Sequence, residues 1–273
     1  MDINSWTALI SGASSGIGAE FARQLHVLGL NVLLVARRED RLRGLCNELN
    51  AERAGSAEYL RADLTDFRAG SSEGMYALVE SLKGRTIDLL VNNAGCGSFG
   101  FFEELPLDGE TRMVDLNVSA TLTLAHALIP GMKKRKRGGI ISVSSLAAFQ
   151  PLPFMATYAG TKAFNFFHST ALRQELRQSG VRVTTVCPGP TATEFGGVAR
   201  VPGTAAGIGR DAVDMVVRES IAAFIADRAF VFTGRRTWLL SLLVRALPVN
   251  FSIWLAWRAL KPALRSSQGG ADG

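Results

Sequence analysis

The stretch Ser11-Gly12-Ala13-Ser14-Ser15-Gly16-Ile17-Gly18 decides the fold of this chain. It follows a short apolar run, Thr7 to Ser11, and leads into a segment with the apolar periodicity of a helix. Its glycines let the backbone turn sharply and approach a pyrophosphate, whose charge suits the free N–H groups of a helix N-terminus. An ordinary strand-to-helix turn is the alternative for the loop taken alone. Its place at the first strand of an alternating chain favours a dinucleotide site.

The rest of the chain continues this alternation of short apolar runs and longer helical segments. We expect strands at Thr7–Ser11, Asn31–Ala36, Glu58–Arg61, Asp88–Val91, Gly139–Val143, Arg182–Cys187 and Phe230–Phe232. We expect helices at Gly16–Leu28, Glu39–Glu52, Asp66–Leu82, Asp108–Arg137, Thr157–Gln178 and Asp211–Ala226. The pattern predicts an α/β protein with a doubly wound, mostly parallel sheet of about seven strands and helices on both faces, the Rossmann fold.

The composition is that of a globular protein. With 273 residues, 47% hydrophobic and 20% charged, the chain is too apolar for a disordered protein and too mixed for a bundle of membrane helices. Cys46, Cys96 and Cys187 are far apart and have no histidine at ligand spacing, so we expect neither disulfides nor a metal site. The first residues do not have the pattern of a secretory signal, so we expect a cytoplasmic protein.

Positive charge is concentrated at one place. The net charge is +6 and the pI is about 9.6, but the run from Lys133 to Arg137 supplies five of these charges, and without it the net charge would be +1. Cations in the last turn of a helix interact with its free carbonyl groups. Aromatic and base-reading side chains are not interleaved with the run, so we expect no nucleic-acid partner.

The glycine spacing G-x-x-x-G-x-G resembles that of the short-chain dehydrogenase/reductase family, whose loop usually opens with Thr where this chain has Ser11. Further motifs follow in the family's order, and they are Asn92-Asn93-Ala94-Gly95, Asn117, Ser145, Tyr158-x-x-x-Lys162 and Pro188-Gly189. Together the motifs span most of residues 6 to 195. The resemblance implies an oxidoreductase that transfers a hydride between a nicotinamide cofactor and a carbonyl or hydroxyl group of a small molecule.

The end of the second strand predicts which nicotinamide cofactor is bound. An acidic residue there accepts the ribose hydroxyls of NAD, whereas an arginine pairs with the 2′-phosphate of NADP. This chain has Val35-Ala36-Arg37-Arg38, with no acid at the strand end. A solvated helix start is the alternative, but cations are unfavourable at a helix N-terminus and therefore indicate a bound anion. We predict NADP(H), with Arg37 as the main contact and Ser15 as a helper.

The other expected cofactor contacts come from the loop and from the resemblance. Those at the phosphate end are Gly12, Ser14, Ser15, Gly16, Ile17, Gly18 and Arg38. The resemblance implies that Asp63 and Leu64 hold the adenine, that Asn92, Ala94 and Gly95 lie under the adenosine ribose, and that Pro188, Gly189 and either Thr191 or Thr193 fix the nicotinamide carboxamide. A helix cap is the alternative for Asp63, although Asp66 is the better cap. A plain turn is the alternative for the threonines.

Tyr158 and Lys162 are the catalytic pair that the resemblance implies. They are four residues apart and so project from one face of a helix. A nearby ammonium and a positively charged nicotinamide favour the phenolate, so we expect Lys162 to lower the pKa of Tyr158. Lys162 would also hold the nicotinamide ribose, as in the family. A solvated surface pair is the alternative for this spacing alone.

Ser145 and Asn117 complete the expected catalytic set. Ser145 follows a strand, where parallel sheets build their sites, and its hydroxyl can donate to a substrate carbonyl. Ser144 competes with it, and either serine could be a turn residue, but the family's spacing to the tyrosine matches Ser145. The matching Asn of the family kinks its helix and holds a water, which implies a proton path from Asn117 through that water, Lys162 and the ribose.

An apolar substrate is expected, such as a ketone, a ketoacyl chain or a steroid-like molecule. The apolar residues near the motifs are Phe99, Phe101, Phe102, Phe149, Phe154 and Met155, and core packing explains them equally well. We expect the segment rich in Gly and Ala from Glu194 to Ile208 to be a mobile substrate lid. We also expect a homodimer or homotetramer. A non-catalytic NADP-binding regulatory or scaffold protein is the alternative function, because a fold alone specifies no chemistry.

The C-terminal part differs from the rest, so we divide the chain into a dinucleotide-binding and catalytic domain, residues 1–236, and an extension, residues 237–273. From Arg235 to Arg265 there are six basic residues and no acidic ones, together with Trp238, Trp254 and Trp257. Arg245, Pro248 and Asn250 make a membrane-spanning helix costly. Two interpretations remain equal: peripheral contact with anionic lipid, or packing on the core, the substrate pocket or a partner subunit.

Overall fold

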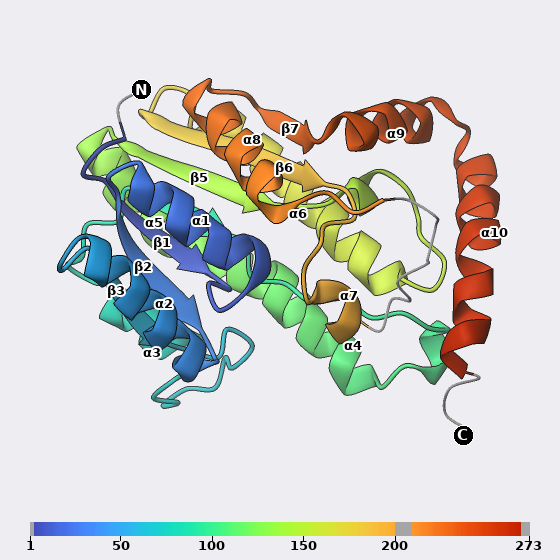
Figure 1. Cartoon of the computed structure of the whole chain (residues 1–273), viewed down its shortest axis with the longest axis horizontal. Coiled ribbons are helices and arrows are strands. Elements are labelled where there is room, and N and C mark those ends of the chain that lie inside the picture. Colours follow the sequence, from blue (N-terminus) through green and yellow to red (C-terminus); the bar gives the residue numbers. More distant parts are fainter. Residues whose placement is uncertain (1–2, 200–208, 269–273) are drawn as a thin grey trace.

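A seven-stranded sheet runs through the protein (Figure 1), whose computed structural model describes residues 3–199 and 209–268. The strands are β1 Thr7–Ser11, β2 Asn31–Ala36, β3 Ala57–Arg61, β4 Leu89–Asn92, β5 Gly138–Val143, β6 Val181–Pro188 and β7 Phe230–Thr233. They pair in parallel in the order β3-β2-β1-β4-β5-β6-β7. The winding reverses between β1 and β4, and at such a point the carboxyl ends of parallel strands leave a crevice for ligands.

Helices cover both faces of this sheet. They are α1 Gly16–Val27, α2 Glu39–Glu52, α3 Met75–Ser81, α4 Leu107–Val114, α5 Ala120–Arg135, α6 Ala156–Glu175, α7 Phe195–Val198, α8 Val213–Ile225, α9 Arg235–Ala246 and α10 Val249–Gln268. Successive β1 residues point to opposite faces. Ile10 joins the apolar core under α1, α2 and α8, and Leu9 joins the core under α3 and α5. The predicted Rossmann fold is therefore confirmed, with every strand pair parallel.

The helix predicted from Asp66 is wrong over its first half, because α3 begins only at Met75. Asp66 was expected to cap that helix, but its carboxylate instead accepts hydrogen bonds from the backbone and guanidinium of Arg68 and from the hydroxyl of Ser71. Such local side-chain bonds compete with helix formation. Gly70, at φ +81°, also leaves the helical region. These residues form a loop that returns to the end of β3.

The predicted helix from Asp108 to Arg137 is interrupted at its centre. Between α4 and α5 the residues Asp115–Ser119 form a π-helical segment, η2, which contains Asn117. A π-bulge redirects a helix without ending it and often marks a functional position. The interruption agrees with the kink that the family resemblance implied at this asparagine.

Two residues of the basic run from Lys133 to Arg137, at the end of α5, form contacts within the fold. Arg135 donates to the carbonyl of Ile87 at 2.7 Å, and Arg137 forms an ion pair with the buried Asp88 at 3.4 Å. Arg137 also lies 5.3 Å from the centre of the Trp6 ring. These contacts tie α5 to the start of β4, which gives two of the five cations a role in the fold.

The C-terminal extension forms two helices at the edge of the sheet beyond β7 (Figure 1). Helix α9 packs against β7 and against the 3₁₀ turn η3, Leu146–Phe149. Pro248 lies between α9 and α10, so the apolar stretch is broken in two, as its sequence predicts. Within the described ranges, no helix combines the length and the apolarity that crossing a membrane would need.

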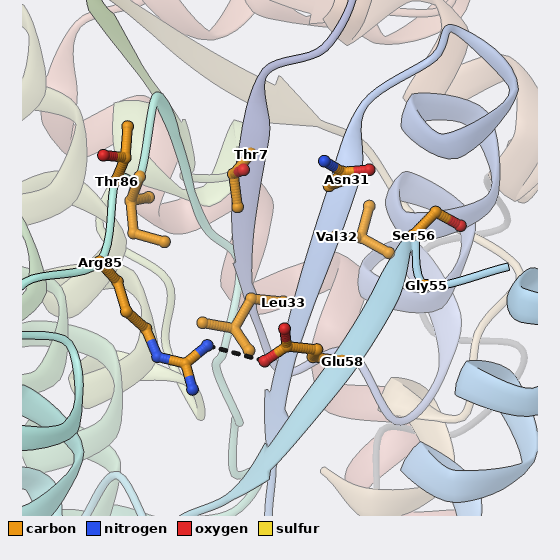
Figure 2. A pocket seen from close by; sticks show the side chains of 10 residues that line it. Thr7, Asn31, Val32, Leu33, Gly55, Ser56, Glu58, Arg85 and Thr86 are labelled. Carbon is orange, nitrogen blue, oxygen red and sulfur yellow. Dashed lines mark hydrogen bonds and ion pairs between the residues drawn. The ribbon is translucent and has the colours of Figure 1, made fainter. Parts of the chain in front are cut away.

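Figure 2 shows a hollow of about 310 Å³ at the other end of the sheet, among the amino ends of β1, β2 and β3. Thr7, Asn31 and Ser56 line it, and an ion pair of 2.7 Å joins Arg85 to Glu58 at its side. Because ligand crevices of parallel sheets lie at the carboxyl ends of the strands, this hollow is not the expected cofactor site.

Candidate active site

The glycine loop lies between β1 and α1, and it is held in place from two sides. Gly12 donates its N–H to the carbonyl of Val35 at 2.8 Å, which fixes the loop to the end of β2. A Cβ on Gly12, at φ +69°, would lie 2.8 Å from the Cα of Ala94, and a Cβ on Gly18 would overlap the carbonyl oxygen of Gly12. The loop therefore needs glycine at both positions. At Gly12 the reasons are the positive φ and the close contact, and at Gly18 the reason is the close contact.

Ser11 and Asn93 join this loop to the segment after β4. The Ser11 hydroxyl accepts the N–H groups of Asn93 and Ala94 at 3.0 and 3.1 Å, and the Asn93 amide donates to the Ser11 carbonyl at 2.9 Å. The predicted cofactor residue Asn92 instead points its amide at the carbonyl of Thr121 on α5, at 3.2 Å. Asn93 is thus a residue of the site that motif reasoning did not single out, although it stands inside the quoted motif.

Arg38 is the cation that lies against the loop. Its guanidinium donates to the hydroxyls of Ser14 and Ser15, at 3.1 and 2.6 Å, and forms an ion pair with Glu194 at 3.0 Å. Arg41 pairs with the other oxygen of the same carboxylate at 2.7 Å. Hydrogen bonds from Arg41 and Arg38 lower the pKa of Glu194, so this carboxylate is ionised at neutral pH. Glu194 and Arg41 give no local sequence signal for this role.

Arg37 is close enough to Asp63, the residue expected to meet the adenine, for its charge to act on that carboxylate. Asp63 accepts the N–H and the hydroxyl of Thr65 at 3.0 and 2.8 Å, and Arg112 of α4 lies 3.6 Å from its other oxygen. Burial opposes the charge of Asp63, but the bonds from Thr65 and the charges of Arg37 and Arg112 outweigh it and lower its pKa. Leu64 is buried beside it. The carboxylate is therefore a fixed anion at the rim of the crevice.

Tyr158 lies in the first turn of α6, and Ser145 lies at the end of β5 beside it. Burial raises the pKa of Tyr158, while a hydrogen bond with Ser145 works in the opposite direction. The expectation that Lys162 lowers the pKa of this tyrosine is not met by the protein's own residues, because burial dominates. Ser144 is committed elsewhere, since its hydroxyl donates to the backbone carbonyl of Lys162 at 2.7 Å. Ser145 is thus the serine of the two that faces Tyr158.

Lys162 lies one helical turn after Tyr158 and is almost fully buried. Its Nζ donates to the carbonyl of Val143 at 2.9 Å and lies 5.9 Å from the centre of the Tyr158 ring. Burial lowers the pKa of Lys162 to about 8, and the acidic groups acting on it are the thiols of Cys96 and Cys187. Among the residues that the structure describes, no carboxylate pairs with this buried ammonium, which indicates a place for ligand hydroxyls.

Asn117 is fully buried in η2, and its side chain clamps the chain beside the lysine. Its Oδ1 accepts the N–H of Cys96 and its Nδ2 donates to the carbonyl of Cys96, both at 2.9 Å. The same Nδ2 lies 2.9 Å from the hydroxyl of Thr161. A Cβ on Gly95 would lie 3.1 Å from Oδ1 of Asn117 and 3.3 Å from Nζ of Lys162. Asn117, Lys162 and Tyr158 therefore lie around one short segment, residues 95–97, and Ser145 joins them through its hydrogen bond with Tyr158.

The segment after β6 closes over this centre. Thr191 donates its hydroxyl to the carbonyl of Gly189 at 3.0 Å, and the Thr193 methyl is the atom nearest to a Cβ built on Gly16, at 3.1 Å. Pro188 is the last residue of β6. The ring of Phe195 in α7 lies 5.3 Å from the ring of Tyr158 and is tilted by 47° against it. Of the substrate lid expected at 194–208, residues 200–208 lie outside the described ones.

An apolar cluster surrounds the tyrosine, and α10 contributes to it. Its buried members are Phe99, Met113, Ala147, Phe154, Met155, Tyr158, Leu260, Ala263 and Leu264. Phe99 and Phe154 had been named from sequence as substrate or core residues. The three residues from α10 were not, because nothing in their own sequence shows which part of the molecule they meet. One wall of the candidate site thus comes from the C-terminal extension.

The described residues fit a nicotinamide dinucleotide phosphate. A glycine turn with open backbone N–H groups suits the pyrophosphate, and two arginines with two serine hydroxyls suit an additional phosphate. The buried Lys162 donates to the carbonyl of Val143, the last residue of β5, and Tyr158 lies one helical turn before it on α6. Residues that could hold a metal ion do not cluster anywhere in 3–199 or 209–268.

Known proteins resemble this chain in sequence. A family model described as short chain dehydrogenase matches residues 6–200. A very-long-chain 3-oxoacyl-CoA reductase of Coprinopsis cinerea is 39% identical over 181 residues, which are 66% of this chain and 52% of that protein. A protein of the same name from Ajellomyces capsulatus is 33% identical over 247 residues, 89% of this chain and 71% of that one. The chain spans about half the length of the first relative.

Solved structures resemble it over nearly their whole length. A short-chain dehydrogenase from Sphingobium yanoikuyae in complex with NADPH is 32% identical, with a TM-score of 0.78 over 96% of this chain and 95% of that chain. The bulky-bulky ketone specific alcohol dehydrogenase from Comamonas testosteroni is 29% identical, with a TM-score of 0.75 over 89% of this chain and 92% of that chain.

Proposed function

Because the chain belongs to the short-chain dehydrogenase/reductase family, we propose that it is an oxidoreductase that transfers a hydride between NADP(H) and a carbonyl or hydroxyl group of an apolar small molecule. The observation that carries this proposal is the meeting of Tyr158, Ser145, Lys162 and Asn117 at one end of the crevice. Asn117 lies in η2 and Ser145 lies directly before η3, while Tyr158 and Lys162 lie one turn apart on α6. A scaffold protein has no need to bury an ammonium whose partner, among the described residues, is a backbone carbonyl and not a carboxylate, beside a phenol.

The residues divide the chemistry between them. A bound nicotinamide supplies or accepts the hydride. In reduction, Tyr158 donates its proton to the substrate oxygen, and Ser145 donates a hydrogen bond that stabilises the charge developing there. Lys162 stabilises the phenolate that Tyr158 becomes and binds ribose hydroxyls. Asn117 hydrogen-bonds to the backbone of Cys96. It thereby positions the segment 95–97, which lies beside Tyr158 and Lys162.

The preference for NADP(H) over NAD(H) rests on the arginines. Arg38 is the better candidate for the 2′-phosphate than Arg37, because it lies on the serine hydroxyls of the glycine loop. Arg41 adds a second guanidinium to the same place, through the carboxylate that both share. The structural relative from Sphingobium yanoikuyae binds NADPH, which supports the assignment. Equal affinity of this protein for NADH and NADPH would overturn it.

The substrate class is proposed from the apolar cluster around Tyr158. Phe99, Phe154 and Leu260 offer hydrocarbon surface and no hydrogen-bonding groups, which suits an alkyl chain or a fused ring system beside the carbonyl. The names of the relatives, 3-oxoacyl-CoA reductase and bulky-bulky ketone specific alcohol dehydrogenase, agree with this chemistry. We propose a ketone flanked by apolar groups, a ketoacyl chain and a steroid-like ketone being members of that class.

A panel of such ketones, with NADPH oxidation followed by absorbance, tests the proposal. Turnover with at least one apolar ketone, and none with short hydrophilic ketones, is the expected result. NADPH binding without turnover of any ketone or reverse oxidation of any alcohol would favour the alternative, a non-catalytic NADP-binding regulatory or scaffold protein. From the family resemblance we further propose a cytoplasmic homodimer or homotetramer, which light scattering of the purified protein would check.

A further inference from the structure

We propose that the outer face of α9 and α10 binds the surface of an anionic lipid bilayer. This outer face is made of Trp238, Leu239, Leu242, Leu243, Val249, Phe251, Trp254, Leu255 and Trp257. Each of these side chains is between 39% and 61% exposed. Scattered exposed hydrophobic residues are normal on soluble proteins, but here nine of them fall on two successive helices, which indicates an interaction surface. The binding of this face to lipid does not depend on the proposed reaction.

The two sides of α10 have different partners. Ala256, Leu260 and Ala263 recur at helical spacing and are buried against the body of the protein. Trp254 and Trp257 lie outside this buried side and are 50% and 39% exposed. The core therefore explains the inner side and leaves the outer side without a partner among the described residues. A helix with this division lies flat on an interface rather than across a membrane.

Charge identifies the kind of surface that fits. The segment from Arg235 to Arg265 has six basic residues and no acidic one. Two of the cations lie over the exposed indoles, Arg258 at 5.7 Å from the Trp254 ring and Lys261 at 4.1 Å from the Trp257 ring. Tryptophan prefers the headgroup level of a bilayer, and basic side chains extend from there to lipid phosphates. The outer face thus combines the apolar, aromatic and basic groups that anionic lipid attracts.

A second copy of the chain is a poor occupant of the same face. In a twofold-symmetric dimer the same patch would meet itself. The basic residues of one copy, among them Arg245 and Arg258, would then lie near those of the other with no acidic residue of the segment to neutralise them. Anionic lipid supplies the missing negative charge without this cost.

The proposed lipid-bound helices also adjoin the candidate active site. At the start of α9, Thr237 donates to the carboxylate of Asp211 at 3.1 Å, and a Cβ on Gly189 would collide with the hydroxyl of the same threonine. On α10, Leu260 and Leu264 belong to the cluster around Tyr158. Helix α10 thus contributes one side to the apolar cluster around Tyr158 and the other side to the proposed membrane surface.

Vesicle binding of the full-length protein tests this proposal. The probes are vesicles of phosphatidylcholine with 30% phosphatidylglycerol, vesicles of phosphatidylcholine alone, and a double variant, Trp254→Glu with Trp257→Glu. The matched control is Tyr76→Glu, because Tyr76 is 54% exposed on α3, away from the extension. Circular dichroism and NADPH affinity verify that each variant is folded.

The expected result is cosedimentation of wild type and Tyr76→Glu with the anionic vesicles, weaker binding to neutral ones, and loss of binding as salt is raised. The double variant should bind about tenfold more weakly or worse, because each glutamate removes an apolar contact and adds repulsion. Brominated lipid should quench tryptophan fluorescence of wild type, since Trp6 is buried while the other three are exposed. No binding to anionic vesicles, unchanged binding of the double variant, or self-association through this face in place of lipid binding would each overturn the proposal.

Discussion

Replacing Glu194 by Gln should tighten the binding of NADPH. In the structure its carboxylate pairs with Arg38 at 3.0 Å and with Arg41 at 2.7 Å, where the proposed function places the 2′-phosphate of the cofactor. Two anions cannot share these guanidinium groups without cost, so a bound phosphate has to displace the carboxylate or lie beside it. The Glu194→Gln substitution would keep the shape of the side chain and remove its charge.

The size of the effect follows from the exposure of the pairs. Arg38, Arg41 and Glu194 have 41%, 42% and 49% of their side-chain surface exposed, so solvent screens each pair. Exposed ion pairs of this kind shift an equilibrium by about threefold each, hence about tenfold for the two together. NADH has no 2′-phosphate and does not need the arginines, so its affinity should change by less than about twofold.

Titration calorimetry of NADPH and NADH with wild type and variant measures both constants directly. Glu48→Gln is the matched control, because Glu48 forms an equally short and equally exposed pair with Arg23, at 2.7 Å. Glu194→Gln should raise the NADPH to NADH affinity ratio, and Glu48→Gln should not. An unchanged or weaker affinity for NADPH in Glu194→Gln, in a wild type that does prefer NADPH, would refute the reasoning. A wild type without that preference would instead refute the proposed cofactor.

Three other predictions concern the centre of the site. Gly97→Ala should lower kcat/KM by more than about tenfold, because its Cβ would lie 2.7 Å from the Phe195 ring, whereas Gly109→Ala, whose Cβ meets nothing within 4 Å, should not; steady-state kinetics would check this. Asn117→Ala should cost about 2–3 kcal/mol of unfolding free energy in urea, since it leaves the partly buried N–H and carbonyl of Cys96 unpaired, and a loss below about 1 kcal/mol would contradict the clamp. Burial lowers the pKa of Lys162 from 10.5 to about 8, so the unfolded chain binds more protons between these pH values and wild-type stability rises with pH there. Lys162→Met lacks this rise, so its unfolding free energy relative to wild type should fall by up to about 3 kcal/mol from pH 7 to pH 10, and a constant difference would contradict the burial of the charge.

Apolar runs predicted the central strands well because these strands are covered on both faces. β1 and β2 begin and end at the predicted residues, Thr7–Ser11 and Asn31–Ala36. The main error in the predicted elements is the helix from Asp66, and local hydrogen bonding explains it. The Asp66 carboxylate accepts bonds from the Arg68 N–H and the Ser71 hydroxyl, which stabilise a loop where periodicity indicated a helix. Apolar periodicity shows which side chains can be buried. It does not show that a polar side chain will hydrogen-bond to nearby backbone groups in place of the helical hydrogen bonds.

The site was predictable where its residues stand in motifs and not where contacts are distant in sequence. Tyr158 and Lys162 are one helical turn apart, so their spacing predicted their meeting. Glu194 lies 156 residues from Arg38 in the chain, so no local sequence pattern predicts their ion pair. Side-chain direction is also missing from the sequence: only the structure shows that Arg38 donates to Ser14 and Ser15 and that Ser144 donates to the carbonyl of Lys162. Which arginine binds a cofactor phosphate, and which serine acts in catalysis, stay predictions.

Transfer of isotope from the cofactor to the substrate tests the central claim most directly. NADPH carrying deuterium at both hydrogen positions of C4 is incubated with a ketone that the wild type reduces, and mass spectrometry locates the label in the product. Wild type should place deuterium on the carbinol carbon, and Tyr158→Phe should do so at least about a hundredfold more slowly while binding NADPH normally. An alcohol product without deuterium, or full turnover by Tyr158→Phe, would contradict the account.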